Sequence, residues 1–153
     1  MESQREASDP RRHPVELKIK TLAEEGRAVI RVEDIMIKDI YTIHPEERVA
    51  LARLRMLRHG LGALPVIDKD GTLVGILTLR DVDLAGPEAL VLPVGELMTR
   101  DLITRKKDTL LGEIVDIMME TGIQRIPIVD DEGKLIGLVT QSTVIRSIRP
   151  LIK

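Results

Sequence analysis

A threonine followed three residues later by an aspartate is the pair in this chain with the clearest chemical potential. Thr78 and Asp81 lie where the apolar segment 75–77 ends and a helical pattern begins. A threonine hydroxyl can donate a hydrogen bond to a phosphate, and a carboxylate can accept from both hydroxyls of a ribose diol. Arg80, between them, adds positive charge. The spacing therefore indicates a phosphate-and-ribose clamp.

The same pair also has a purely structural interpretation. Threonine is a good helix N-cap, and an acidic residue in the first turn is stabilised by the helix dipole. Thr78 and Asp81 satisfy both preferences without any ligand. From the residues alone, the cap and the clamp carry equal weight.

Two prolines within apolar segments give a second indication. Pro65 and Pro127 each interrupt a strand-like run. A proline removes a donor from the sheet ladder, so backbone groups beside it can face a ligand. A simple position at a sheet edge explains such a proline at least as well.

The elements around these residues occur twice. Residues 32–85 align without a gap to 94–147 at an offset of 62. The glycine and threonine of 75–81 recur as Gly137 and Thr140, whereas Asp81 is replaced by Thr143. Each copy predicts the order strand, helix, strand, strand, helix.

In the first copy, the segment 39–43 is expected to be the first strand. A helix follows, with Pro45 at its first position and Gly60 at its end. Its buried stripe is expected to consist of Val49, Leu51, Leu54 and Leu57. The strands 63–67 and 73–77 form a hairpin around the acidic turn 68–71, and the last helix runs from near Thr78 to about Ala85.

The chain is expected to divide at the repeats. The predicted parts are a flexible tail (1–14), a lead-in segment that packs on the module (15–31), repeat 1 (32–85), a linker (86–93), and repeat 2 with a C-terminal tail (94–153). A unit of about 54 residues is marginally stable alone. We therefore expect an α/β (α+β) fold of two βαββα repeats, packed as a pseudo-two-fold pair with facing sheets.

Composition excludes several classes of protein. Tyr41 is the only aromatic residue among Phe, Trp and Tyr, so the core must be aliphatic. The net charge of −2 argues against nucleic acid as a partner, and no apolar run approaches the ~18–20 residues that span a bilayer. A cytoplasmic location is expected. The absence of Asn with 31% charged residues is typical of thermophile proteins.

Other candidate sites are weak. The histidines, His13, His44 and His59, have no carboxylate at ligand spacing, so no metal site is predicted. Arg48 and Arg55 share a helix face that is more readily a solvated surface than a nucleic-acid surface. No nucleophile–base pair and no P-loop are evident, so the protein is not expected to be an enzyme.

Taken together, the repeated motifs resemble the cystathionine-β-synthase (CBS) domain. In the first copy, the resemblance rests on Met36, Asp39 and Thr42, on the segment 64–68, and on Gly75-x-x-Thr78-x-x-Asp81. The second copy has Met98, Asp101, Thr104, 126–130 and Gly137-x-x-Thr140. The resemblance covers about 32–147 and implies a stand-alone tandem CBS pair, or Bateman module.

The resemblance implies the residues of two nucleotide sites in clefts between the repeats. In the first site, Thr78 and Asp81 correspond to the phosphate and ribose residues. The complete first set is Ile40, Thr42, Gly62, Ala63, Leu64, Pro65, Thr78, Arg80 and Asp81. The second set is Leu102, Thr104, Gln124, Arg125, Ile126, Pro127, Thr140, Ser142 and Thr143. Because Thr143 cannot make the charged diol contact, we expect one good site and one weak or empty site.

The resemblance also implies a function. Such modules bind AMP, ADP or ATP, and in some cases S-adenosylmethionine, as ligands rather than cofactors. We therefore expect an energy-sensing regulatory module that forms a homodimer and controls a partner protein in trans. The alternative is a ligand-free CBS scaffold that mediates protein–protein assembly.

Overall fold

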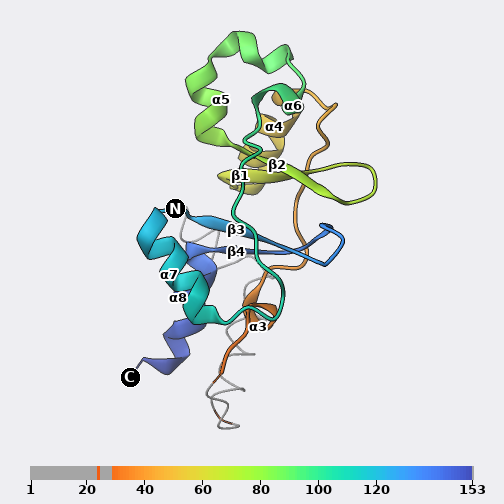
Figure 1. Cartoon of the computed structure of the whole chain (residues 1–153). Helices are drawn as coiled ribbons and strands as arrows, with labels where there is room; N and C mark the ends of the chain where they lie inside the picture. The colour runs from red at the N-terminus through yellow and green to blue at the C-terminus, as the bar shows by residue number, and fades with distance from the viewer. Residues whose placement is uncertain (1–23, 25–28, 153) are drawn as a thin grey trace. The chain divides into compact units, whose positions relative to one another are not determined.

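The computed structural model describes residue 24 and residues 29–152 (Figure 1). The predicted tail and most of the lead-in segment lie outside the described residues. The first repeat contains α3 (Val32–Ile35), α4 (Val49–His59), β1 (Ala63–Ile67), β2 (Leu73–Thr78) and α5 (Leu79–Ala85). The linker contains η1 (Pro87–Val91). The second repeat contains α6 (Val94–Leu97), α7 (Leu111–Thr121), β3 (Arg125–Val129), β4 (Leu135–Thr140), α8 (Gln141–Ile148) and η2 (Arg149–Leu151).

Two hairpins form the sheets, as the sequence predicts. β1 pairs with β2 in antiparallel register, with Ala63 opposite Thr78 and Leu64 opposite Leu77. β3 pairs with β4 in a separate two-stranded sheet. The mixed α+β class is therefore confirmed.

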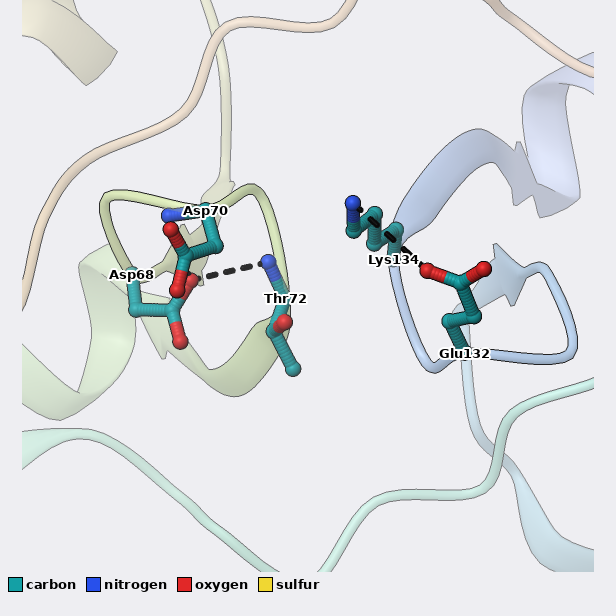
Figure 2. A network of polar contacts seen from close by, with 5 residues as sticks. All are labelled: Asp68, Asp70, Thr72, Glu132 and Lys134. Atoms are coloured by element: carbon teal, nitrogen blue, oxygen red, sulfur yellow. Dashed lines mark hydrogen bonds and ion pairs between the residues drawn. The ribbon is translucent and has the colours of Figure 1, made fainter.

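The acidic turn of the first hairpin is held by its own side chain. Asp68 accepts hydrogen bonds through Oδ1 from the backbone amides of Asp70 (2.9 Å) and Thr72 (3.0 Å), as Figure 2 shows for Thr72. Gly71 has a φ of 87°, a left-handed conformation that glycine adopts without strain. The tip also pairs with residues 132–135, where the amides of Leu73 and Leu135 donate to the carbonyls of Gly133 and Gly71. In that neighbouring turn Lys134 pairs with Glu132 at 3.6 Å (Figure 2).

The first long helix corrects two predictions. It begins at Val49, and Pro45 belongs to a preceding turn in which the amide of Glu47 donates to the carbonyl of His44. Its buried residues are Val49, Ala52 and Met56. The three predicted core leucines, Leu51, Leu54 and Leu57, are 39–51% exposed. The helix ends as predicted, with Gly60 in the left-handed conformation.

The segment predicted as the first strand of each repeat forms only one β-bridge in the structure. Ile43 forms one parallel bridge with Val66, and Arg105 forms one with Ile128. A β-bulge interrupts the register at Val66 and Ile67, where the amide of Ile67 donates to the carbonyl of Ile43. The segment 39–43 is therefore not a full strand.

The chain forms two compact units, and each unit combines segments from both sequence repeats. Among the described residues, unit 1 comprises 24, 29–40, 104–131 and 136–152, and unit 2 comprises 41–103 and 132–135. In unit 1, α3 leads to Ile37, which exchanges two hydrogen bonds of 2.9 Å with Leu138 of β4. In unit 2, α6 leads to Thr99, which exchanges two bonds of 2.9 and 2.8 Å with Ile76 of β2. Each hairpin is thus completed by the segment that opens the other repeat.

Each unit has its own aliphatic core. In unit 1 the core is built around Ile114 of α7 and Ile126 and Ile128 of β3, all completely buried. In unit 2 the core is built around Met56 of α4 with Leu64 and Val66 of β1. These cores fix the helices and hairpins that carry the candidate site residues.

Candidate ligand-binding site

The Thr78–Asp81 pair lies where β2 passes into α5. Thr78 is the N-cap of α5, and its Oγ1 accepts a hydrogen bond of 3.0 Å from the backbone amide of Asp81. Because a hydroxyl is both donor and acceptor, the Thr78 hydroxyl proton is left for another partner. The cap predicted from the sequence is therefore present.

The Asp81 carboxylate has no role in that cap. The side chain is half-buried, and its carboxylate makes no hydrogen bond or ion pair with any described residue. The position of Asp81 in the first turn of α5 stabilises its charge through the helix dipole, but the carboxylate oxygens have no hydrogen-bond donor among the described residues. Asp81 therefore has acceptor capacity available for a ligand.

Several predicted neighbours lie beside this pair in unit 2. Ala63 is opposite Thr78 in the hairpin, and the carbonyl of Gly62 accepts from the amide of Leu79 at 2.8 Å. Thr42 adjoins the bridge between Ile43 and Val66. The backbone of 62–63 and the Thr78–Asp81 turn therefore form one continuous patch.

The remaining members of the first set differ in their surroundings. The side chain of Leu64 is completely buried in the core of unit 2, so only its backbone is available to a ligand. Arg80 is exposed on the first turn of α5. Ile40 belongs to unit 1, whereas the other residues of the first set belong to unit 2.

The backbone carbonyls of the two prolines already have hydrogen-bond partners. The carbonyl of Pro65 accepts from the amide of Ile43 at 3.1 Å, and that of Pro127 accepts from the amide of Arg105 at 3.2 Å. Both carbonyls are therefore hydrogen-bonded to the segment that precedes the long helix of the same repeat. Pro65 also keeps its register with Ile76.

The single aromatic side chain already has a stacking partner. The rings of Tyr41 and His59 are 4.0 Å apart between centroids, with planes inclined by 14°. His59 is the last residue of α4. The Tyr41 ring is therefore already stacked on another side chain of unit 2.

The corresponding turn in unit 1 is arranged differently. Thr140 is the N-cap of α8, and its Oγ1 accepts from the amide of Thr143 at 3.1 Å. The hydroxyls of Thr140 and Thr143 also bond to each other at 3.0 Å, and Thr143 is only 2% exposed. Thr143 therefore satisfies its polar group internally and presents no charge where Asp81 presents one.

Arg125, a predicted member of the second set, has no charged counterpart in the first repeat. It begins β3, in the position that Ala63 occupies in the other repeat. Its side chain is half-buried, and the loss of solvation lowers the pKa of Arg125. Among the described residues, its guanidinium makes no hydrogen bond or ion pair.

The rest of the second set surrounds β3 and the start of α8. Gln124 accepts through its carbonyl from the amide of Gln141 at 3.0 Å, and Ile126 is completely buried in the core. Thr104, Pro127 and Ser142 belong to the same unit, while Leu102 belongs to unit 2. The structure thus gathers eight of the nine predicted residues, 104, 124–127, 140, 142 and 143, in unit 1.

Other kinds of site find little support in the part of the chain that the structure describes. No group of three or more His, Asp and Glu side chains within it is placed to share a metal ion. Arg48, the residue before α4, donates to the carbonyl of Val91, and Arg55 of α4 donates to the carbonyl of Thr42. None of the helices within residues 29–152 has the length and hydropathy needed to cross a bilayer.

Comparison with known proteins identifies the family of the two repeats. The CBS domain model matches residues 32–86 and 94–150, which are the two repeats. The chain belongs to the CBS domain family. Both the tandem organisation and the α+β class expected from the sequence are confirmed.

Two solved CBS proteins of similar fold contain adenosine compounds. The crystal structure of CBSX2 in complex with AMP is 29% identical, has a TM-score of 0.72, and is matched over 79% of this chain and 97% of that one. The CBS domain pair of protein MJ0100, in complex with 5′-methylthioadenosine and S-adenosyl-L-methionine, is 30% identical with a TM-score of 0.70. It is matched over 77% of this chain and 94% of that one.

A third relative is a much longer enzyme. Inosine-5′-monophosphate dehydrogenase of Methanocaldococcus jannaschii is 33% identical over 130 residues, which cover 85% of this chain and 26% of the enzyme. This chain thus spans about a quarter of the length of that relative. The thermophile-like composition is consistent with relatives from archaeal and thermophilic sources, including Thermoplasma acidophilum and Aquifex aeolicus.

Proposed function

We propose that this CBS pair is a regulatory module that binds an adenosine nucleotide, AMP, ADP or ATP, at the Thr78–Asp81 turn. The observation that carries the proposal is the half-buried carboxylate of Asp81, which has no partner among the described residues. The N-cap bond joins the Thr78 hydroxyl to the backbone amide of Asp81, so it leaves the Asp81 carboxylate oxygens without a hydrogen bond. The complexes of similar CBS proteins with AMP and with S-adenosylmethionine support adenosine compounds as the ligand class.

Each residue has a separate task in the proposed complex. The Asp81 carboxylate accepts hydrogen bonds from the two ribose hydroxyls, and the Thr78 hydroxyl donates to the phosphate. Arg80, exposed on the same turn, adds charge toward the phosphate. The backbone of Gly62 and Ala63, beside Thr78 in the hairpin, faces the base.

The second repeat is proposed to lack the ribose contact. Thr143 has no charge, and its hydroxyl is bonded to that of Thr140. A hydrogen bond to a charged group contributes about 1.5–3 kcal/mol, which is about a 10- to 100-fold difference in affinity. A nucleotide held through its ribose therefore binds the first repeat more tightly.

Isothermal titration with AMP tests the assignment. The variant Asp81→Asn removes the charge with little change of shape, and we expect its affinity for AMP to fall about 10- to 100-fold. Asp83→Asn is the matched control, because Asp83 lies on the same helix and its nearest cationic partner, Arg53, is 4.0 Å away at the exposed surface. Unchanged affinity in Asp81→Asn together with lost affinity in Thr143→Ala would overturn the assignment.

A thermal-shift screen separates a sensor from a ligand-free scaffold. A ligand that binds only the native state raises the unfolding temperature, by an amount set by its concentration relative to Kd. AMP, ADP, ATP and S-adenosylmethionine are tested at millimolar concentration. A shift with any of them that Asp81→Asn reduces supports the sensor, and no shift with all four favours the scaffold.

We also infer that the module forms a homodimer and acts on a partner protein in trans. Leu51, Leu54 and Leu57 present an exposed apolar face on α4, and Ile145 and Ile148 do so on α8. Contiguous apolar surface of this kind is typical of association sites. The match to the dehydrogenase covers only 26% of that enzyme, so we propose regulation, with no catalytic step, for this chain.

A further inference from the structure

Two side chains of α4 hold the segment 41–43, which precedes that helix in the chain. The guanidinium of Arg55 donates a hydrogen bond of 2.5 Å to the carbonyl of Thr42. The ring of His59, four residues further along the helix, stacks on the ring of Tyr41 with 4.0 Å between their centroids. Residues four apart lie on the same face of a helix. One face of α4 therefore contacts two consecutive residues of the segment.

The segment 41–43 is not fixed by a regular strand ladder. It forms a single β-bridge, between Ile43 and Val66, and the amide of Ile43 donates to the carbonyl of Pro65 at 3.1 Å. A backbone without a ladder depends on other hydrogen bonds for its conformation. The half-buried bond from Arg55 has a charged donor, and such bonds are stronger than those between neutral groups. Arg55 therefore fixes the backbone just before the bridge.

The long helix of the second repeat has neither of these side chains. At the positions equivalent to Arg55 and His59, α7 has Ile117 and Thr121. Neither isoleucine nor threonine can supply a guanidinium or an aromatic ring. The hydroxyl of Thr121 donates instead to the carbonyl of Ile117, within α7 itself, at 2.6 Å. The two contacts are therefore specific to the first repeat.

The equivalent segment of the second repeat has a different and more local attachment. The carbonyl of Thr104, which corresponds to that of Thr42, accepts a bond of 2.7 Å from the guanidinium of Arg105, the next residue. Arg105 pairs with Glu113 of α7 at 3.3 Å, through side chains that are 38% and 54% exposed. Exposed ion pairs contribute little to stability. The segment is therefore tied more firmly to its helix in the first repeat than in the second.

We propose that Arg55 and His59 are positioning residues for the first ligand site, and that they hold the segment 41–43 in the conformation that the ligand requires. Neither side chain touches the ligand in this proposal. The inference rests on the proposed function in taking Thr42 to be one of the residues that contact the nucleotide. A segment that is ordered before binding costs less to order on binding, so the affinity is higher. The first repeat thus gains affinity from a source other than Asp81.

Hydrogen exchange of the full chain without ligand measures the positioning directly. Arg55→Met removes the donor and keeps an apolar stem, whereas Arg55→Lys keeps a charged donor. The probe is the amide of Ile43, which donates to Pro65. We expect this amide to exchange about 3- to 10-fold faster in Arg55→Met, and less so in Arg55→Lys, because the segment opens more often. Arg53→Met is the matched control, since Arg53 lies on the same helix and pairs with Asp83 at 4.0 Å on the exposed surface.

Isothermal titration with AMP measures the effect on the ligand site. We expect Arg55→Met to bind AMP about 3- to 10-fold more weakly than the parent. His59→Thr gives α4 the residue of the second repeat, and its affinity should fall about 2- to 10-fold. Arg55→Lys should recover part of the affinity, a rescue that a general loss of packing would not show. Unchanged AMP affinity in either Arg55→Met or His59→Thr overturns the proposal, as does an equal loss of affinity in Arg53→Met.

The two measurements separate this inference from the proposed function. If exchange at Ile43 rises in Arg55→Met while AMP does not bind the parent, Arg55 holds the segment and the nucleotide function is wrong. If AMP binding depends on Asp81 while exchange and affinity are the same in Arg55→Met and the parent, the nucleotide site stands and the positioning role is wrong.

Discussion

Replacement of Gly75 by alanine tests how β2 is joined to the segment that follows α6. A Cβ at Gly75 would lie 2.6 Å from Sδ of Met98 and 2.9 Å from the carbonyl oxygen of Thr99. The methionine end can move aside. The Thr99 backbone cannot move freely, because it exchanges two hydrogen bonds with Ile76 of the same strand.

The expected cost follows from two opposing effects. Overpacking of a tight contact costs about 1–3 kcal/mol, and the lower chain entropy of alanine returns about 0.5–1 kcal/mol. We therefore expect Gly75→Ala to lower the free energy of unfolding by about 1–2 kcal/mol. At this chain length that corresponds to a fall of about 2–8 °C in the unfolding temperature.

Gly112→Ala is the matched control for that measurement. Gly112 is the second residue of α7, and a Cβ there meets no atom within 4 Å. The same substitution should therefore stabilise by about 0.5–1 kcal/mol through helix propensity. Urea unfolding followed by circular dichroism measures both variants. Gly75→Ala with a stability equal to or above that of the parent would refute the close approach of Thr99 to β2.

Two further predictions concern the turn and the exposed helix face. Asp68→Ala removes the acceptor of two amides and should cost about 1–2 kcal/mol in urea unfolding, whereas Asp70→Ala, exposed beside it, should change stability little. Leu54→Glu places a charge in the exposed leucine face of α4, so the mass measured by sedimentation should fall from dimer to monomer. A mass unchanged by Leu54→Glu, or equally reduced by Arg58→Glu on the same helix, would argue against that interface.

Several features could be predicted from the residues alone, because they depend on contacts between residues close together in the sequence. The glycine at position 60 ends α4 because it adopts φ of 65° without a Cβ penalty. Asp68 closes the hairpin turn through its own side chain, and Thr78 and Thr140 cap the helices that follow them. Each of these contacts joins residues at most four positions apart. The tandem repeat was likewise visible because equivalent turns need the same residue types.

The buried face of α4 could not be predicted from such local contacts. Apolar residues occur on more than one side of this helix, and the pattern predicted a leucine stripe. The core of unit 2 instead takes Val49, Ala52 and Met56 and leaves Leu51 and Leu54 exposed. Which apolar side faces the core depends on the strands that pack against the helix, and the sequence of the helix does not specify them.

The sequence by itself determined the CBS repeats, the hairpins, the capping threonines and the Asp81/Thr143 difference, because these depend on residue type and short spacing. Only the tertiary structure decided that the segment opening each repeat completes the hairpin of the other, through Ile37 and Leu138 and through Thr99 and Ile76. It also decided that the carboxylate of Asp81 and the guanidinium of Arg125 have no partner among the described residues. Whether a charged side chain has a partner depends on all the groups that pack around it. Those groups come from distant parts of the sequence, so only the tertiary structure brings them together.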